Sequence, residues 1–208
     1  MLLSLFDRRP IVVALAGPNG AGKTTFYYSN LQAAGLRLVN ADVLARELRM
    51  DPYRAARIAC SIREELVRQR ESFVFETFFA DLVGDKLRFL QNAARAGYTV
   101  LLCFIGVSSP KISQDRVDMR VMQGGHDVPR ENLIARYPRT LTNLAAAIRE
   151  LPHVRVFDNS NLKNPFRLAA VCEQGQVAQL EKPIPKWLRS VLPAQGSRRE
   201  SRTTPGPT

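Results

Sequence analysis

Short runs of apolar residues alternate along this chain with longer segments whose apolar positions recur at helical spacing. Five runs predict strands, at about residues 11–16, 36–40, 72–77, 98–105 and 154–158. The run at 98–105 is apolar throughout, as expected of a strand buried on both faces. Strands that alternate with helices predict an α/β fold, with a five-stranded, mainly parallel sheet and helices on both of its faces.

The segments between these strands carry helix start and stop signals. Helices are predicted at about 24–34, 43–49, 52–66 and 81–96, then from 108 to the glycines at 124 and 125, and from 129 to about 148. Pro138 lies inside the last of these and predicts a kink or a split there, because proline lacks a backbone N–H. Residues 168–172 and 176–180 predict a small C-terminal hairpin.

These elements predict one folded domain with short appendages. Residues 1–10 form an N-terminal lead-in, and residues 11–192 form the domain, with a lid region at about 108–140. Residues 193–208 are rich in Gly, Ser, Pro, Thr and Arg, which predicts a disordered tail. No apolar stretch approaches the length of a membrane span or has the arrangement of a signal peptide, so we expect a cytoplasmic protein without a membrane partner.

Charge and cysteine content narrow the choice of partners only in part. The net charge is +11, and 24 of the 30 basic residues are arginine. This charge suits a partner rich in phosphate or an acidic protein, and it is also typical of solvated helix faces. Three isolated cysteines and two histidines have no metal-ligand spacing, which disfavours a zinc site and indicates a reducing compartment.

The first strand runs directly into the pattern G-x-x-x-x-G-K-[ST], which is the phosphate-binding loop, or P-loop (Walker A). Glycines let the backbone curl so that successive N–H groups face one anion, and the following helix adds the positive end of its dipole. The lysine reaches the β- and γ-phosphates, and the hydroxyl of Thr24 can bind Mg²⁺. We therefore expect ATP to bind to Gly17, Pro18, Asn19, Gly20, Ala21, Gly22, Lys23, Thr24 and Thr25.

Polar residues at the ends of the next two strands are candidates for substrate chemistry. Asp42 follows the second strand and could act as general base in phosphoryl transfer, although Asp is also a favoured helix N-cap and Asn40 could cap instead. Glu76 ends an apolar strand beside Thr77. It could bind a substrate hydroxyl, hold Mg²⁺ through water, or pair with an arginine.

The lid region carries two groups of arginines on either side of the glycine pair. Arg116 and Arg120 are four residues apart, and Arg136 and Arg139 are three apart. Arginines on a flap over the phosphates would neutralise charge in the transition state, whereas the alternative is that they lie on solvated helix faces. The fourth strand ends in Gly106 rather than in Asp, which disfavours a motor-type ATPase.

Taken together, these residues resemble the zeta-toxin family of P-loop kinases, in its compact bacterial branch. The matching stretches are the phosphate loop, Val39-Asn-Ala-Asp42, Phe73-Val-Phe-Glu-Thr77, Arg116-Val-x-x-Arg120, Gly124-Gly-His-Asp-Val-Pro129, Arg136-Tyr137, Leu141-x-Asn143-Leu144 and Phe157-Asp-Asn-Ser160. The similarity covers about residues 11–160.

The resemblance implies an ATP- and Mg²⁺-dependent kinase that acts on a hydroxyl of a UDP-N-acetyl amino sugar. It implies that the catalytic residues are Lys23, Asp42, Arg116 and Arg120, that Arg136 and Arg139 hold ATP, and that Asn40, Asp42, Glu76 and Thr77 face the substrate. It also implies a toxin that a separate small helical antitoxin neutralises. Two alternatives remain: a kinase of another small alcohol, such as a nucleoside, sugar or antibiotic, and an Arg-rich nucleotide-binding protein acting on nucleic acid. The chain shows no aromatic-interleaved basic platform, which disfavours the last.

Overall fold

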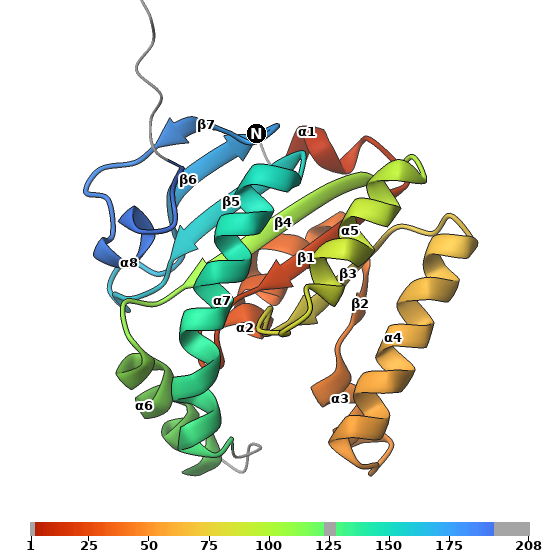
Figure 1. Cartoon of the computed structure of the whole chain (residues 1–208). Coiled ribbons are helices and arrows are strands. Elements are labelled where there is room, and N and C mark those ends of the chain that lie inside the picture. The colour runs from red at the N-terminus through yellow and green to blue at the C-terminus, as the bar shows by residue number, and fades with distance from the viewer. Residues whose placement is uncertain (1–2, 123–127, 194–208) are drawn as a thin grey trace, which may run out of the picture.

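A seven-stranded sheet runs through the protein, and helices cover both of its faces in this computed structural model (Figure 1). The structure describes residues 3–122 and 128–193. The strand order is β2-β3-β1-β4-β5-β6-β7. The strands are β1 (Ile11–Ala16), β2 (Arg37–Val39), β3 (Phe73–Thr77), β4 (Thr99–Gly106), β5 (His153–Asp158), β6 (Arg167–Glu173) and β7 (Gln176–Leu180).

The five predicted strands form the parallel part of the sheet, and the predicted fold class is confirmed. β1 lies between β3 and β4, and all six of its residues are buried. In the register of β1 and β3, Leu15 lies opposite Glu76 and Ala16 opposite Thr77. The end of β3 therefore lies beside the start of the phosphate loop, at the carboxyl edge of the sheet.

The C-terminal hairpin belongs to this sheet, which corrects the predicted count of five strands. β6 pairs antiparallel with β5, and β7 pairs antiparallel with β6. The residues of β5 from Val154 to Phe157 are buried, so an open edge there would leave backbone groups without partners. The hairpin supplies those partners and extends the sheet to seven strands.

The predicted helices are present, with their ends shifted by a few residues. The helix after the phosphate loop begins as α2 (Lys23–Phe26), continues as a π turn at Tyr27–Leu31 and a 3-10 turn at Gln32–Ala34, and stops at Gly35, whose φ is 66°. The other helices are α1 (Leu3–Phe6), α3 (Ala41–Glu47), α4 (Pro52–Arg68), α5 (Asp85–Arg95), α6 (Pro110–Met122), α7 (Arg130–Glu150) and α8 (Lys186–Arg189). Four-residue α1 and α8 are too short to leave a periodic signal in the sequence.

Helix α7 passes through Pro138 without a break, so the predicted split is wrong. The proline is exposed, whereas Tyr137 and Leu144 on either side of it are buried. Thr142 Oγ1 donates a hydrogen bond to the Pro138 carbonyl at 3.2 Å. Packing of the buried face holds the two halves in one helix, which offsets the backbone hydrogen bond that proline cannot make.

Two pairs of helices extend beyond the carboxyl edge of the sheet (Figure 1). α6 and the first half of α7 lie on one side, and α3 and the first half of α4 lie on the other. The glycine pair at 124 and 125, and the predicted tail apart from Pro193, lie outside the described residues. Among the described helices, none combines the length and apolar character that crossing a membrane requires.

Gly106, at the end of β4, packs directly against the ring of Trp187, and this contact yields a test of the fold. A Cβ atom at position 106 would lie 2.2 Å from two ring atoms of Trp187, whose Nε1 donates to Asp158 Oδ1 at 3.1 Å. We expect Gly106→Ala to lower the free energy of unfolding by about 1–3 kcal/mol, because the added methyl group overpacks this contact. Urea unfolding followed by circular dichroism, which also reports on a chain without Trp187, measures the effect.

The matched comparison is the same substitution in a Trp187→Leu background, where the added methyl group has room. There we expect Gly106→Ala to cost much less than in the wild-type chain. Equal costs in the two backgrounds would contradict the close packing of Gly106 and Trp187.

Candidate active site

The phosphate loop lies at the carboxyl end of β1, and its backbone has the conformation that its glycines were predicted to allow. The φ angles of Gly17, Gly20 and Gly22 are 142°, 67° and 91°. A Cβ atom on Gly17 would lie 2.1 Å from the carbonyl oxygen of Ile105. Among described residues, the N–H groups at the amino end of α2 make no backbone hydrogen bond and so remain available to an anion.

The carbonyl groups of residues 18–21 each accept a hydrogen bond from a side chain. The bond to Gly20 is 3.4 Å long and the bond to Ala21 is 2.8 Å long. In chain order, the donors are Lys23 Nζ, Ser113 Oγ, Arg116 Nη1 and Asn159 Nδ2. The loop is thus held from its outer side by α6 and by the residue that follows β5.

Lys23 is withdrawn into the protein, with 4% of its surface exposed. Its Nζ donates to the Pro18 carbonyl at 3.0 Å and lies 3.7 Å from Glu76 Oε1. Burial lowers the pKa of Lys23, and the charges of Glu76 and Asp42 oppose that effect. The lysine is therefore a desolvated cation that an incoming phosphate would stabilise.

Glu76 brings the phosphate loop and the end of β2 together. Its Oε2 accepts a 2.8 Å hydrogen bond from Thr24 Oγ1 and another of 2.8 Å from Asn40 Nδ2. Its side chain is 11% exposed. The predicted pairing partner was an arginine, whereas the structure surrounds the carboxylate with Lys23, Thr24 and Asn40.

Asn40, rather than Asp42, caps helix α3. Asn40 Oδ1 accepts from the backbone N–H of Asp42 at 2.8 Å and of Val43 at 3.3 Å. The Asp42 side chain is exposed, and its carboxylate has no hydrogen-bond or ion-pair partner within the described ranges. It lies close enough to Lys23 for its charge to raise the pKa of the lysine. The cap and the acid, which the sequence left in competition, are therefore two different residues.

Thr77 and Thr25 have less direct places at this site. Thr77 Oγ1 accepts from the backbone N–H of Phe79 at 3.1 Å, so it shapes the turn after β3. Thr25 is exposed on the first turn of α2.

The two predicted arginines of α6 have different surroundings. Arg116 donates to the carbonyl of Gly20 and, at 2.7 Å, to the carbonyl of Asn159. Arg120, one turn further on, is exposed, and its positive charge contributes to lowering the pKa of Lys23. Arg116 thus contacts the outer side of the loop, while Arg120 lies within electrostatic reach of its lysine.

The arginines of α7 also differ. The guanidinium carbon of Arg136 lies 5.4 Å from the centroid of the Phe78 ring, and Lys23 Nζ lies 5.3 Å from the same centroid. Arg139 instead donates to the carbonyl of Ala135, in its own helix. Arg136 is therefore the α7 arginine that approaches the phosphate loop.

Two residues at this site were not singled out by sequence reasoning, Phe78 and Ser113, whereas Asn159 lies in the family-like stretch Phe157-Asp-Asn-Ser160. Asn159 had a partial signal, because it follows a strand at the carboxyl edge of the sheet. Ser113 and Phe78 had none, since a serine inside a helix and a phenylalanine after a strand are ordinary in any sequence.

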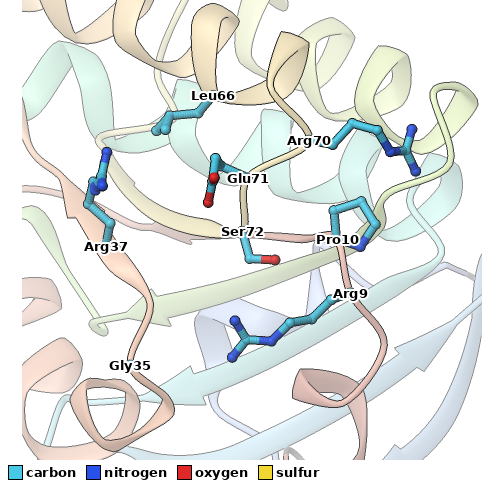
Figure 2. A pocket seen from close by; sticks show the side chains of 8 residues that line it. All are labelled: Arg9, Pro10, Gly35, Arg37, Leu66, Arg70, Glu71 and Ser72. Atoms are coloured by element: carbon cyan, nitrogen blue, oxygen red, sulfur yellow. The ribbon is translucent and has the colours of Figure 1, made fainter.

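A cavity of about 480 Å³ lies at the opposite, amino edge of the sheet (Figure 2). Its lining includes Arg9 and Arg70. Arg9 Nη2 donates to the carbonyl of Ala34 at 3.3 Å, and Arg70 Nη1 donates to the carbonyl of Ala96 at 3.2 Å. Both carbonyls are at helix carboxyl ends, which attract positive charge. These arginines are explained by the helix ends, and the cavity lies at the far end of the strands from the phosphate loop.

The sequence profile of the family described as zeta toxin matches residues 52–166, which is more than half of the chain. This range includes Glu76 and both groups of arginines, and it begins after the phosphate loop. An uncharacterized protein of Haemophilus influenzae is 27% identical over 127 residues, which cover 58% of this chain and 88% of that protein.

Two solved structures illustrate the shared fold. The complex of AvrRxo1-ORF1 with AvrRxo1-ORF2, solved with sulphate ions, has a TM-score of 0.59 and 19% identity, covering 94% of this chain and 69% of that chain. The PezAT toxin-antitoxin system of Streptococcus pneumoniae has a TM-score of 0.57 and 16% identity, covering 76% and 74%. At these identities the two structures establish a shared fold, and the profile match establishes the family. The chain belongs to the zeta toxin family and has a P-loop kinase fold.

Proposed function

We propose that this protein is an ATP-dependent kinase that transfers the γ-phosphate to a hydroxyl of a UDP-N-acetyl amino sugar, as the toxin of a toxin-antitoxin pair. The observation that carries the proposal is the exposed carboxylate of Asp42 beside the phosphate loop. Because Asn40 caps α3, Asp42 is left without a structural task among the described residues. Membership of the zeta toxin family supports this class of activity.

In the proposed reaction, Lys23 leaves the Pro18 carbonyl and binds the phosphates of ATP. Asp42 accepts the proton of the acceptor hydroxyl. The hydroxyl oxygen bonds to the γ-phosphorus while the bond from that phosphorus to the β,γ-bridging oxygen breaks and ADP leaves. Arg120 and Arg136 supply positive charge to the transferring group, and Arg139 has no assigned contact with it. Glu76 Oε1, which lies 3.7 Å from Lys23 Nζ, and Thr77 would face the acceptor.

The residues beside the loop also fit Mg²⁺. Mg²⁺ prefers oxygen ligands, and the Thr24 hydroxyl and the Glu76 carboxylate are hydrogen-bonded to each other at 2.8 Å. Bound there, Mg²⁺ would neutralise charge on the β- and γ-phosphates. Asn40 holds the Glu76 carboxylate toward Thr24.

The partner would be a separate antitoxin protein. The structure of the PezAT system, which shares this fold, is described as a toxin-antitoxin system. By that analogy we infer that a small helical protein neutralises this chain.

Replacing Asp42 tests the proposed base. We expect UDP-N-acetylglucosamine to accelerate ADP release by the purified wild-type protein. Asp42→Asn should reduce this acceleration by at least about 100-fold, because the amide cannot accept the proton. The variant should still bind ATP. Coupled measurement of ADP gives the rate, and titration with a fluorescent ATP analogue gives the affinity.

Asp51→Asn is a matched control, since Asp51 caps α4 and has no place at the loop. If the UDP-sugar is neither bound nor phosphorylated, the substrate proposal fails, and a panel of nucleosides, sugars and antibiotics tests the other alcohols. Binding of RNA or DNA that persists above about 0.2 M salt would favour the nucleic-acid alternative.

Expression of the wild-type chain should arrest bacterial growth, and Asp42→Asn should relieve the arrest.

Replacing Glu76 tests the electrostatics around Lys23. The charge of Glu76, 3.7 Å from Lys23 Nζ, raises the pKa of Lys23, so Glu76→Gln should lower that pKa further. Lysine is protonated below its pKa and loses its charge as the pH rises through it. ATP affinity should therefore begin to fall at a lower pH in Glu76→Gln than in the wild-type protein.

The measurement is the dissociation constant of ATP across an alkaline pH series. Glu71→Gln is the control, because Glu71 lines the cavity at the amino edge of the sheet. Superimposable pH profiles for wild type and Glu76→Gln would show that the carboxylate does not sustain the charge of Lys23.

A further inference from the structure

The side chains of Ser113, Arg116 and Asn159 bond to the outer side of the phosphate loop, and nothing in the proposed reaction uses them there. We propose that these three residues form a brace that sets the direction of the loop N–H groups, so that they are positioning residues for ATP. This inference rests on the proposed function, because it assigns Arg116 a place behind the phosphates rather than on them.

The geometry of the peptide bond carries the argument. A peptide unit is planar, and its C=O and N–H point in opposite directions, so fixing the carbonyl of one residue fixes the N–H of the next. The brace holds the carbonyls of residues 19, 20 and 21. It therefore orients the N–H groups of residues 20, 21 and 22. Of these, the N–H of Ala21 bonds to Pro18 within the loop, and those of Gly20 and Gly22 make no backbone hydrogen bond among described residues.

The brace residues are built into the protein rather than placed on its surface. Asn159 is 4% exposed and Ser113 is 2% exposed. The amide of Asn159 is fixed at both ends, because Nδ2 donates to Ala21 and Oδ1 accepts from the N–H of Phe166 at 3.3 Å. Arg116 joins the parts of the brace, since it bonds to the carbonyls of both Gly20 and Asn159.

Two glycines of the loop also make room for the brace. A Cβ atom on Gly20 would lie 2.6 Å from the carbonyl oxygen of Ser113, and one on Gly22 would lie 2.8 Å from Asn159 Nδ2. Both glycines have positive φ angles as well. They therefore serve the curl of the loop and the close approach of its brace at once.

The brace also divides helix α6. Its first two turns, which carry Ser113 and Arg116, are tied to the loop, whereas Arg120 lies beyond them. A closing movement of the lid that leaves these bonds intact must take place beyond Arg116. Within the predicted lid region of 108–140, the brace thus holds the part up to Arg116 to the phosphate loop and does not hold the part after Arg116.

The test combines ATP binding with hydrogen exchange in Arg116→Ala, Asn159→Ala and the double variant. We expect each single substitution to weaken ATP binding about tenfold, as loss of one buried hydrogen bond would do, and to raise KM for ATP more than it lowers kcat. The double variant should lose less than the product of the two, because both residues act on one loop. Exchange of the Ala21 amide, which is hydrogen-bonded to the Pro18 carbonyl, should accelerate about tenfold in the nucleotide-free protein.

Salt dependence separates a brace from a phosphate ligand. Removing a cation that contacts phosphate makes ATP affinity less sensitive to salt, because fewer charges are screened. We expect this for Arg120→Ala but not for Arg116→Ala, which should keep the wild-type salt dependence. Lys111→Ala is the matched control, since it removes an exposed positive charge from the same helix without touching the loop, and it should change neither affinity nor exchange.

Two results would overturn the brace: unchanged exchange of the Ala21 amide in both single variants, or a flattened salt dependence in Arg116→Ala like that in Arg120→Ala. Melting temperatures of the variants identify any that fail to fold, and Ser113→Ala then replaces the failed variant. If the wild-type protein does not bind ATP, the proposed function fails. The exchange experiment still decides the brace, since it uses no nucleotide.

Discussion

The carboxylate of Glu76 is the constraint on which the arrangement of this site depends. Burying a carboxylate is costly unless it is paired, and this one is surrounded by Lys23, Thr24 and the amide of Asn40. These partners come from the phosphate loop and from the end of β2, so one side chain connects the ends of three strands. Asn40 is thereby oriented to cap α3, and the carboxylate of Asp42 has no hydrogen-bond or ion-pair partner in the described part of the chain.

The phosphate loop is supported on both of its sides by different chemistry. On the inner side the N–H groups of Gly20, Gly22 and the amino end of α2 have no backbone partner among described residues and are available to an anion. On the outer side, loop carbonyls bind side chains from α6 and from the end of β5. Preorganised donors stabilise charge without having to reorganise during the reaction. The same bonds anchor the first part of α6, so the arginines of this region differ in role although they share a helix.

Several arginines of this basic chain have partners within the fold. Arg9 and Arg70 bond to helix carboxyl ends, and Arg63 lies buried between the rings of Phe75 and Phe89, 4.9 and 5.6 Å from their centroids. Arg155 pairs with Glu173 across β5 and β6 at 2.5 Å. The net charge of +11 therefore does not by itself indicate a nucleic-acid surface.

The sequence by itself determined the fold class, the order of the parallel strands along the chain and the phosphate loop, because apolar periodicity and the glycine spacing are local properties of the chain. It also pointed to Asp42 and Glu76, since Asp42 follows a strand and Glu76 lies near the carboxyl end of one. Only the tertiary structure decided that Asn40 is the cap, that Arg136 rather than Arg139 approaches the loop, and that the hairpin joins the sheet. Those choices depend on contacts between residues far apart in the chain, such as Asn159 and Ala21, and no local pattern encodes such contacts.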